Sequence, residues 1–464
     1  MGGGNDTINV GLASGLLNHI DGLVQIDGQA GEDHLALFDG SDTVANVGLL
    51  QSQRILGLGM GSTDQSDVTE SGGIGFTQIE GIDLQLGLAA DTIRASAIEV
   101  NTTVHGGAGD DHFVLQGSLK DVKQQYTLIG DAGQNQLSVN MADNVQSNLT
   151  LSALNASKGV LKDAGMLGQV QFQQVDGLDI NLGQKDDTVN IDATVAPVVL
   201  NLNVGKDSVV VHDSAHALDI RLGGGADNDQ VTVIDAHADI QVSGNGGTGF
   251  KKLTVDKTAA VTALNGAVLD NLDGQGATLT DGKVTGLTTG QIAFEGVQQV
   301  NVLLGAGNDA LRVNQSLTET ELNIDGGQGN DTVRVEKLGS ANTSVKGGAN
   351  ADVLTLIVDG VPKADQFTSL TMDVDQLVVD NQSNTTTGVS WTHQDGAKLL
   401  ADIQGGPIGL EVVNTDGAGY TVIQAGTQSD QLTVKSTSSG NVAGSVEGNQ
   451  IELRAGAVVL KQSG

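Results

Sequence analysis

Aspartates that follow glycine-rich turns are the residues of this sequence best placed for chemistry. Asp111 ends the turn 106–111 (GGAGDD), and Asp331 ends the turn 326–331 (GGQGND). Glycine permits the positive φ values of a tight turn, and an aspartate there can bond its own backbone or a cation. Two roles are therefore open for these turns. They supply oxygen ligands to a hard cation such as calcium, or they shape the backbone without any metal.

The turn aspartates recur at a nearly constant interval. Asp187 and Asp207 are 20 residues apart. Asp309, Asp331 and Asp352 follow one another at intervals of 22 and 21 residues. A fixed period near this length indicates that each repeat is one coil of a stacked fold.

Strands are the elements that must position these turns. Apolar and polar residues alternate before each turn, for example at Ile82, Leu84 and Leu86. A period of two is typical of a half-buried strand. Antiparallel sandwiches also alternate, but they favour short hairpins over a 20-residue repeat. The sequence therefore predicts an all-β fold: a right-handed parallel β-solenoid (β-helix) of about 20–22 residues per coil, with irregular loop insertions.

Longer blocks around Phe76, Phe172 and Phe294 resemble one another, so the coils are predicted to form superrepeats. Segments 143–168 and 262–290 break the period and are predicted to be loops or small antiparallel flaps. The chain also begins inside a repeat, which favours a piece of a longer protein or a protomer that stacks end to end. We predict N-terminal coils with a truncated start, three superrepeats and degenerate C-terminal coils, at 1–71, 72–168, 169–289, 290–366 and 367–464.

Composition narrows the functional classes. The 464 residues include 66 Gly, 3 Pro and only 2% aromatics, which fits a narrow aliphatic core with many glycine turns. The formal net charge is −34 and no Lys/Arg cluster occurs, so nucleic acid is not an expected partner. No apolar run is long enough for a membrane span, so membrane insertion is not expected. Without cysteine, metal or sheet stacking must take the place of disulfides.

Histidines and paired carboxylates are the candidates for catalysis. The eight histidines share no metal-ligand spacing. Pairs such as Asp110 with Asp111, and Asp186 with Asp187, resemble the acidic clusters of β-helical polysaccharide lyases and epimerases. The Lys, Arg and aromatic residues expected around an anionic sugar are few, however. We therefore predict that the protein is not an enzyme.

Residues 106–114 and 326–334 match the nonapeptide of the repeats-in-toxin (haemolysin-type calcium-binding) family at every defined position. The irregular repeats resemble most the repeat regions of giant bacterial adhesins and surface proteins. The resemblance implies calcium between stacked turns and export to calcium-rich surroundings. Because a coil here has one such turn and not two, each site would depend on the neighbouring coil. The implied metal ligands are Asp6, Asp33, Asp111 and Asp331 with the carbonyls of Gly106, Gly109, Gly326 and Gly329, and Asp187, Asp309 and Asp352 complete the predicted set.

These patterns favour a structural segment of an extracellular, Ca2+-stabilised bacterial adhesin, surface layer or filament, in which the solenoid is a stiff spacer or assembly unit. Expected partners are further copies, by end-to-end or lateral self-association, and an unidentified host, cell-surface or matrix target. The alternative is an accessory or binding module of a secreted polysaccharide-modifying enzyme. A convergent basic or aromatic groove along one face of the coils would favour that alternative.

Overall fold

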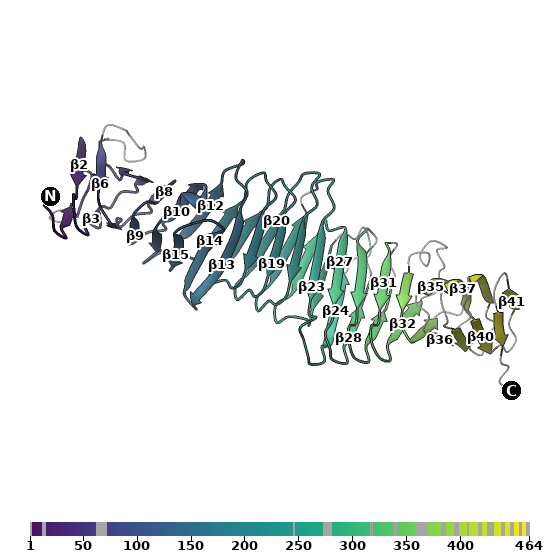
Figure 1. Ribbon diagram of the computed structural model, residues 1–464. Coiled ribbons are helices and arrows are strands. Elements are labelled where there is room, and N and C mark those ends of the chain that lie inside the picture. The colour runs from purple at the N-terminus through teal and green to yellow at the C-terminus, as the bar shows by residue number, and fades with distance from the viewer. Residues whose placement is uncertain are drawn as a thin grey trace. The chain divides into compact units, whose positions relative to one another are not determined.

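The computed structural model divides the chain into two units, Met1–Asp229 with Gly247–Gly249, and Gln230–Gly246 with Phe250–Gly464. The strands of each unit lie in two β-sheets (Figure 1). Side-chain burial is described as far as residue 378. The structure describes all residues except 1, 12–14, 62–71, 245, 272–280, 316, 318, 338, 340, 359–369, 382–386, 394–398, 406–407, 416–419, 425–430, 438–440, 446–449, 454–456 and 461–464.

The strands of the first unit, in spatial order, form two sheets. The first sheet is β1 (Thr7–Val10), β3 (His34–Phe38), β7 (Gly81–Gln85), β9 (Asn101–His105), β11 (Gln125–Ile129), β15 (Gln169–Gln173), β14 (Lys158–Asp163), β13 (Asn148–Asn155), β17 (Thr188–Ile191) and β19 (Ser208–Val211). The second sheet is β2 (Leu23–Asp27), β6 (Gly73–Thr77), β5 (Arg54–Gly57), β4 (Val47–Gln51), β8 (Thr92–Ala95), β10 (His112–Gly117), β12 (Gln136–Met141), β16 (Gly177–Asn181), β18 (Val198–Asn201) and β20 (Leu218–Leu222). A single turn of 3-10 helix, Leu119–Asp121, precedes β11.

The second unit repeats this arrangement. Its first sheet is β21 (Gln230–Val233), β23 (Lys252–Asp256), β27 (Gln299–Leu303), β29 (Glu321–Asp325), β31 (Thr343–Lys346), β33 (Leu370–Asp373), β35 (Thr387–His393), β37 (Ile408–Thr415), β39 (Gln431–Thr437) and β41 (Gln450–Leu453). Its second sheet is β22 (Ile240–Gly244), β26 (Ile292–Glu295), β25 (Gly282–Thr285), β24 (Asn265–Asn271), β28 (Ala310–Val313), β30 (Thr332–Val335), β32 (Val353–Val358), β34 (Gln376–Asn381), β36 (Leu399–Gly405), β38 (Tyr420–Gln424), β40 (Asn441–Ser445) and β42 (Ala457–Leu460).

Most neighbouring strands are parallel and one coil apart, which confirms the predicted parallel β-solenoid. Leu178 pairs with Val198 in β16 and β18, a coil of 20 residues. The coil is 22 residues long between Ala310 and Thr332 in β28 and β30. The inward side chains are mainly Val, Leu and Ile, and nearly all are inaccessible to solvent. The alternation of apolar and polar residues in the sequence therefore predicted the aliphatic core correctly.

Three antiparallel strands interrupt the parallel stacks, namely β5, β14 and β25. The segments predicted to break the period contain β14 and β25, and the predicted flap at 262–290 is described except for 272–280. Gly159 of β14 faces Phe172 of β15, and Gly282 of β25 faces Phe294 of β26, because an added Cβ would lie within 2.2 and 2.5 Å of those rings. Two of the three repeated phenylalanines, Phe172 and Phe294, thus pack against glycines of the inserted strands.

The predicted superrepeats begin beside these antiparallel strands. The β5–β6, β14–β15 and β25–β26 pairs connect residues on both sides of the boundaries at 71/72, 168/169 and 289/290. Sheet hydrogen bonding is therefore continuous across all three. The five predicted segments describe the repeat in the sequence. That they are separate domains stays a prediction.

Candidate metal centre in the glycine–aspartate turns

The turn aspartates are joined from coil to coil by hydrogen bonds to backbone N–H groups. The Asp91 N–H donates to Asp111 Oδ1 at 2.8 Å, and the Asp187 N–H donates to Asp207 Oδ1 at 2.8 Å. Such charge-assisted bonds are stronger than those between neutral groups. Each carboxylate thus fastens its own turn to the preceding coil. We call each such row an aspartate ladder.

Four aspartate ladders occur among the described residues. Three are in the first unit and one is in the second. Asn, Glu or Ser takes the place of aspartate at some positions, and Leu264 contributes only its backbone N–H. The ladders are Asp6–Asp33–Glu80, Asn46–Asp91–Asp111–Asn135–Asp176, Ser147–Asp187–Asp207–Asp229 and Leu264–Asp309–Asp331–Asp352–Asp375.

The ladders of the first unit change sides of the coil at each inserted strand. Asp33 lies where the chain passes from the second sheet to the first, between β2 and β3. Beyond the β5 insertion, Asp91 and Asp111 lie where the chain passes from the first sheet to the second. Beyond the β14 insertion, Asp187 returns to the first position, between β16 and β17. An added strand in one sheet therefore moves the ladder to the opposite turn.

Within a turn, the second carboxylate oxygen faces the turn's own glycine. Gly87 N–H donates to Asp91 Oδ2 at 3.0 Å, and Gly305 N–H donates to Asp309 Oδ2 at 3.1 Å. At Gly106 an added Cβ would lie 2.5 Å from Asp111 Oδ2 and 2.5 Å from the next coil's backbone. Glycine is required there because no side chain fits between the carboxylate and the next coil.

Burial raises the pKa values of carboxyl groups in the aspartate ladders. Asp111 and Asp207 are each 1% exposed. Burial raises the pKa of both carboxyls to about 7, and neighbouring aspartates raise it further, against the lowering effect of the backbone hydrogen bond that each accepts. The pKa of Asp352 is raised to about 6 for the same reasons, and those of Asp91, Asp187 and Asp331 are also raised. Loss of water disfavours the ionised form unless a proton or a cation compensates.

The surroundings of these carboxylates do not match a calcium shell. Calcium takes six to eight oxygen ligands, whereas Asp111 Oδ1 is already occupied by a backbone N–H. The carbonyls of Gly107 and Gly327, which are not among the predicted ligands, accept N–H groups from the next coil. Oδ2 of Asp33, Asp111 and Asp331 is buried without a hydrogen-bond partner, but one such oxygen per turn is far fewer than the ion needs. Among the described residues no group of three or more acidic or histidine side chains could hold a metal. Calcium binding at these turns stays a prediction.

The structure places every predicted ligand in a turn. It brings Asp309, Asp331 and Asp352 together in one ladder, and joins Asp6 to Asp33. Gly109 and Gly329 have φ values of 115° and 135°, which L-residues rarely adopt, and Gly106 and Gly326 donate their N–H groups to the next coil.

Other ladder members were not among the predicted ligands. Asp91, Asp207 and Asp229 follow the same spacing and are equivalent in position, so the period alone would have found them. Asn135 and Glu80 could be found only from the cross-coil contacts.

Four of the histidines whose side chains are described make separate contacts, each with a different polar side chain. His34, His105 and His212 each lie 3.0–3.3 Å from an aspartate of another coil, namely Asp83, Asp131 and Asp192 respectively. His112 Nε2 lies 2.8 Å from Ser138 Oγ, and burial lowers the pKa of this histidine.

Comparisons with known proteins add little to this geometry. No family model and no curated protein matches the chain. Among solved structures it is similar to the extracellular lipase LipA from Serratia marcescens, with 14% identity and a TM-score of 0.18, over 58% of this chain and 43% of the lipase chain. The match thus spans less than half of the lipase. In the part of the chain that the structure describes, no helix is long and apolar enough to cross a membrane.

Proposed function

We propose that the protein is a non-catalytic structural segment of an extracellular adhesin, surface layer or filament, in which stacked coils act as a stiff spacer. The main support for this proposal is the aspartate ladders. Consecutive coils are joined both by parallel strand pairing and by a buried carboxylate bond, as at Asp309, Asp331 and Asp352. A repeat fold in which each coil contacts its neighbours transmits load from one coil to the next.

Calcium enters this proposal as a neutralising cation. A net charge of −34 destabilises a compact state through self-repulsion, and a divalent cation relieves it. The described turns show carboxylate oxygens bonded to N–H groups, so the proposal does not require an ion inside each turn. An extracellular location would supply that calcium. Self-association, end to end or lateral, remains part of the proposal.

Hydrogen–deuterium exchange of the full chain tests the spacer role. We expect consecutive strands from β7 to β12 to exchange slowly and to a similar extent, because every coil is held by the same two kinds of bond. Rapid exchange confined to a few adjacent coils inside that stack would contradict a uniform spacer and would favour a local binding element.

Protease treatment of intact source cells tests the location. Release of peptides from this chain without lysis is the expected result. Peptides that appear only after lysis would contradict an extracellular spacer, whatever the exchange data show.

The alternative, a module of a polysaccharide-modifying enzyme, was expected to show a basic or aromatic groove. A surface depression over β3, β7, β9 and β11 of the first unit is lined by no Lys or Arg, and His34 is the one aromatic ring in its lining. That lining does not favour an anionic polysaccharide.

A further inference from the structure

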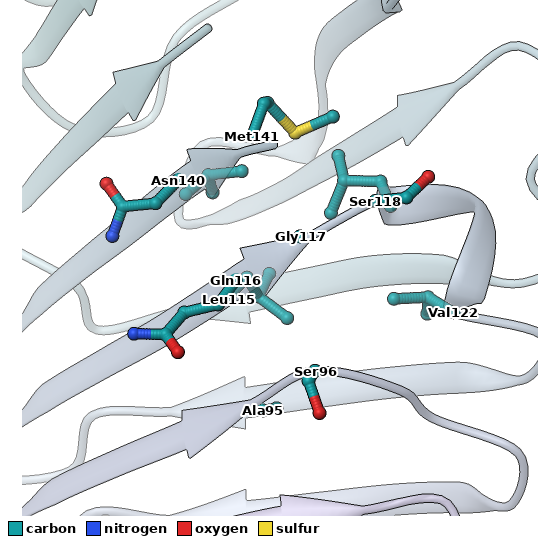
Figure 2. A pocket seen from close by; sticks show the side chains of 11 residues that line it. Ala95, Ser96, Leu115, Gln116, Gly117, Ser118, Val122, Asn140 and Met141 are labelled. Carbon is teal, nitrogen blue, oxygen red and sulfur yellow. The ribbon is translucent and has the colours of Figure 1, made fainter. Parts of the chain in front are cut away.

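Two depressions differ greatly in what they could hold. Figure 2 shows the smaller one, lined among others by Gln116, Ser118 and Asn140. Its volume of about 10 Å3 is about the smallest that admits one water molecule. The larger one is open, measures about 700 Å3 and lies over β3, β7, β9 and β11 of the first unit. We call it the sheet groove.

The half of the sheet groove over β9 and β11 presents amides and hydroxyls at the spacing of the strands. Thr103 of β9 lies opposite Thr127 of β11, and Asn101 Oδ1 accepts the Gln125 N–H at 3.2 Å. Gln125 Nε2 donates to Thr127 Oγ1 at 3.1 Å, so these side chains are held in place. Parallel strands about 4.8 Å apart repeat such groups at short, regular intervals. An extended, hydroxyl-rich chain could follow them.

One end of the sheet groove is acidic. Glu32, Glu80 and Asp83 line it, and no Lys or Arg does. Asp83 Oδ2 lies 3.3 Å from His34 Nε2, and both side chains are substantially exposed. Asp33 also lines the groove, but it is 1% exposed and its carboxylate faces the turn, because Oδ1 accepts the Asp6 N–H and Oδ2 lies against Gly28. The groove therefore offers acceptors and negative charge in excess of donors.

Glycine makes room at this end. An added Cβ at Gly81 would lie 2.6 Å from His34 Cδ2. The imidazole therefore occupies the space that a side chain at this position would fill. The absence of a side chain on Gly81 lets His34 lie over β7 and reach Asp83.

We propose that the sheet groove binds a hydroxyl-rich polymer that carries free amino groups, that is, an amino-sugar chain with unacetylated amines. Its ammonium groups pair with Asp83 and Glu32, and its hydroxyls bond Asn101 and Thr103. Anionic glycans are disfavoured because Glu32 and Asp83 line the site and no Lys or Arg does. This binding role goes beyond the spacer function and does not depend on it.

Calorimetric titration of the full chain with a glucosamine hexamer, at moderate salt, tests the proposal. A hydrogen bond to a charged group contributes about 1.5–3 kcal/mol, so replacing Asp83→Asn together with Glu32→Gln should weaken binding by about tenfold or more. Thr103→Arg, which places a cation in the groove, should do the same. The N-acetylglucosamine hexamer, which keeps the hydroxyls without the charge, should bind far more weakly.

The control must separate the groove from the general negative charge of the chain. Asp143→Asn together with Asp179→Asn removes two carboxylates away from the groove, and these residues are not among those that line it. This double variant should bind the glucosamine hexamer as the unaltered chain does. Equal losses in both double variants would show non-specific attraction and overturn the proposal. Equal binding of the two hexamers, or no binding of the amine form, would overturn it as well, and neither result would affect the exchange test of the spacer.

Discussion

At the scale of single residues, one carboxylate does two structural tasks. Asp111 accepts the Asp91 N–H through Oδ1, and its Oδ2 faces its own turn at Gly106. The same position in the next coil is Asn135, which is fully buried and accepts the Asp111 N–H at 3.0 Å. An amide oxygen therefore suffices for the bond between coils. Ionisation is not needed for it.

This equivalence predicts the effect of two substitutions at one site. Asp111→Asn should change the melting temperature little near neutral pH, because the acceptor remains. Asp111→Ala should lower the unfolding free energy by about 1–3 kcal/mol, because the Asp91 N–H is left buried without an acceptor. Thermal unfolding followed by circular dichroism in chelator compares the two. If the asparagine variant is as unstable as the alanine variant, the carboxylate charge itself is required for the bond between coils.

The raised pKa values of the buried carboxyls predict that stability depends on pH. The pKa values of Asp39, Asp111 and Asp207 are raised to about 7 in the folded chain, above the ordinary value of 3.8. The folded state then binds more protons than the unfolded state between these values, so this stabilisation is present at low pH and is lost as pH rises toward 7. In chelator, the melting temperature should fall from pH 5 to pH 8.

The control for this pH dependence is Asp111→Asn combined with Asp207→Asn, which should flatten the curve. Added calcium at pH 8 should restore stability if the cation replaces the protons. A melting temperature that rises steadily from pH 5 to pH 8 in chelator would contradict the assigned role of the buried carboxyls.

At the scale of elements, the inserted antiparallel strands explain the superrepeat. Phe172 lies in the strand beside β14, where Gly159 leaves space for its ring. Phe294 and Gly282 form the equivalent pair in the second unit. At these two insertions the phenylalanine ring lies against the inserted glycine, whereas Phe113 is buried in β10 between the parallel strands β8 and β12. The sequence left these insertions open as loops or small antiparallel flaps, and the structure shows that β14 and β25 are antiparallel strands within the sheets.

A substitution at the glycine should disturb this packing. Gly159→Ala brings Cβ to 2.2 Å from Phe172 Cζ, so we expect a loss of about 1–3 kcal/mol in unfolding free energy. Phe172→Leu in the same chain should recover part of it. Gly22→Ala is the matched control, since nothing lies within 4 Å of its added Cβ. Equal effects of the two alanine substitutions, measured by chemical denaturation, would argue against the proposed ring contact.

At the scale of the whole molecule, each unit is a stack in which one coil can replace another. Thr188 pairs with Ser208 in β17 and β19, and Ser147 and Asp187 precede equivalent strands. Removing one full coil therefore leaves the inward and outward faces unchanged. Removing one residue fewer turns the inward side chains outward and the outward ones inward, because side chains alternate with a period of two.

Deletion of residues 188–207 should therefore give a folded protein with the β signal per residue unchanged and only a modest loss of melting temperature. Deletion of 188–206 should give a poorly folded or aggregating chain, because the apolar side chains of β19 would face solvent. Circular dichroism and size-exclusion chromatography distinguish the two products. Equal behaviour of the two deletions would contradict a register set by stacked coils.

The sequence by itself determined the local features of this protein. Positive φ at glycine, an aspartate at the end of each turn and alternation along each strand are all encoded within about ten residues, so the solenoid and its period could be predicted. Asp309, Asp331 and Asp352 were rightly expected to stack. In the structure a backbone N–H donates to each of these carboxylates. That contact depends on the orientation of the carboxylate, which the sequence does not give.

Only the tertiary structure decided which coils meet. Asp33 bonds Glu80 across 47 residues, and Asp111 bonds Asn135 across 24. These distances depend on insertions such as β5, which also move the ladder from one turn of the coil to the other. The sheet groove arises in the same way, from His34, Asp83 and Asn101 on three separate strands. Contacts of this kind depend on how strands far apart in the chain are stacked, and a local pattern contains no information about that order.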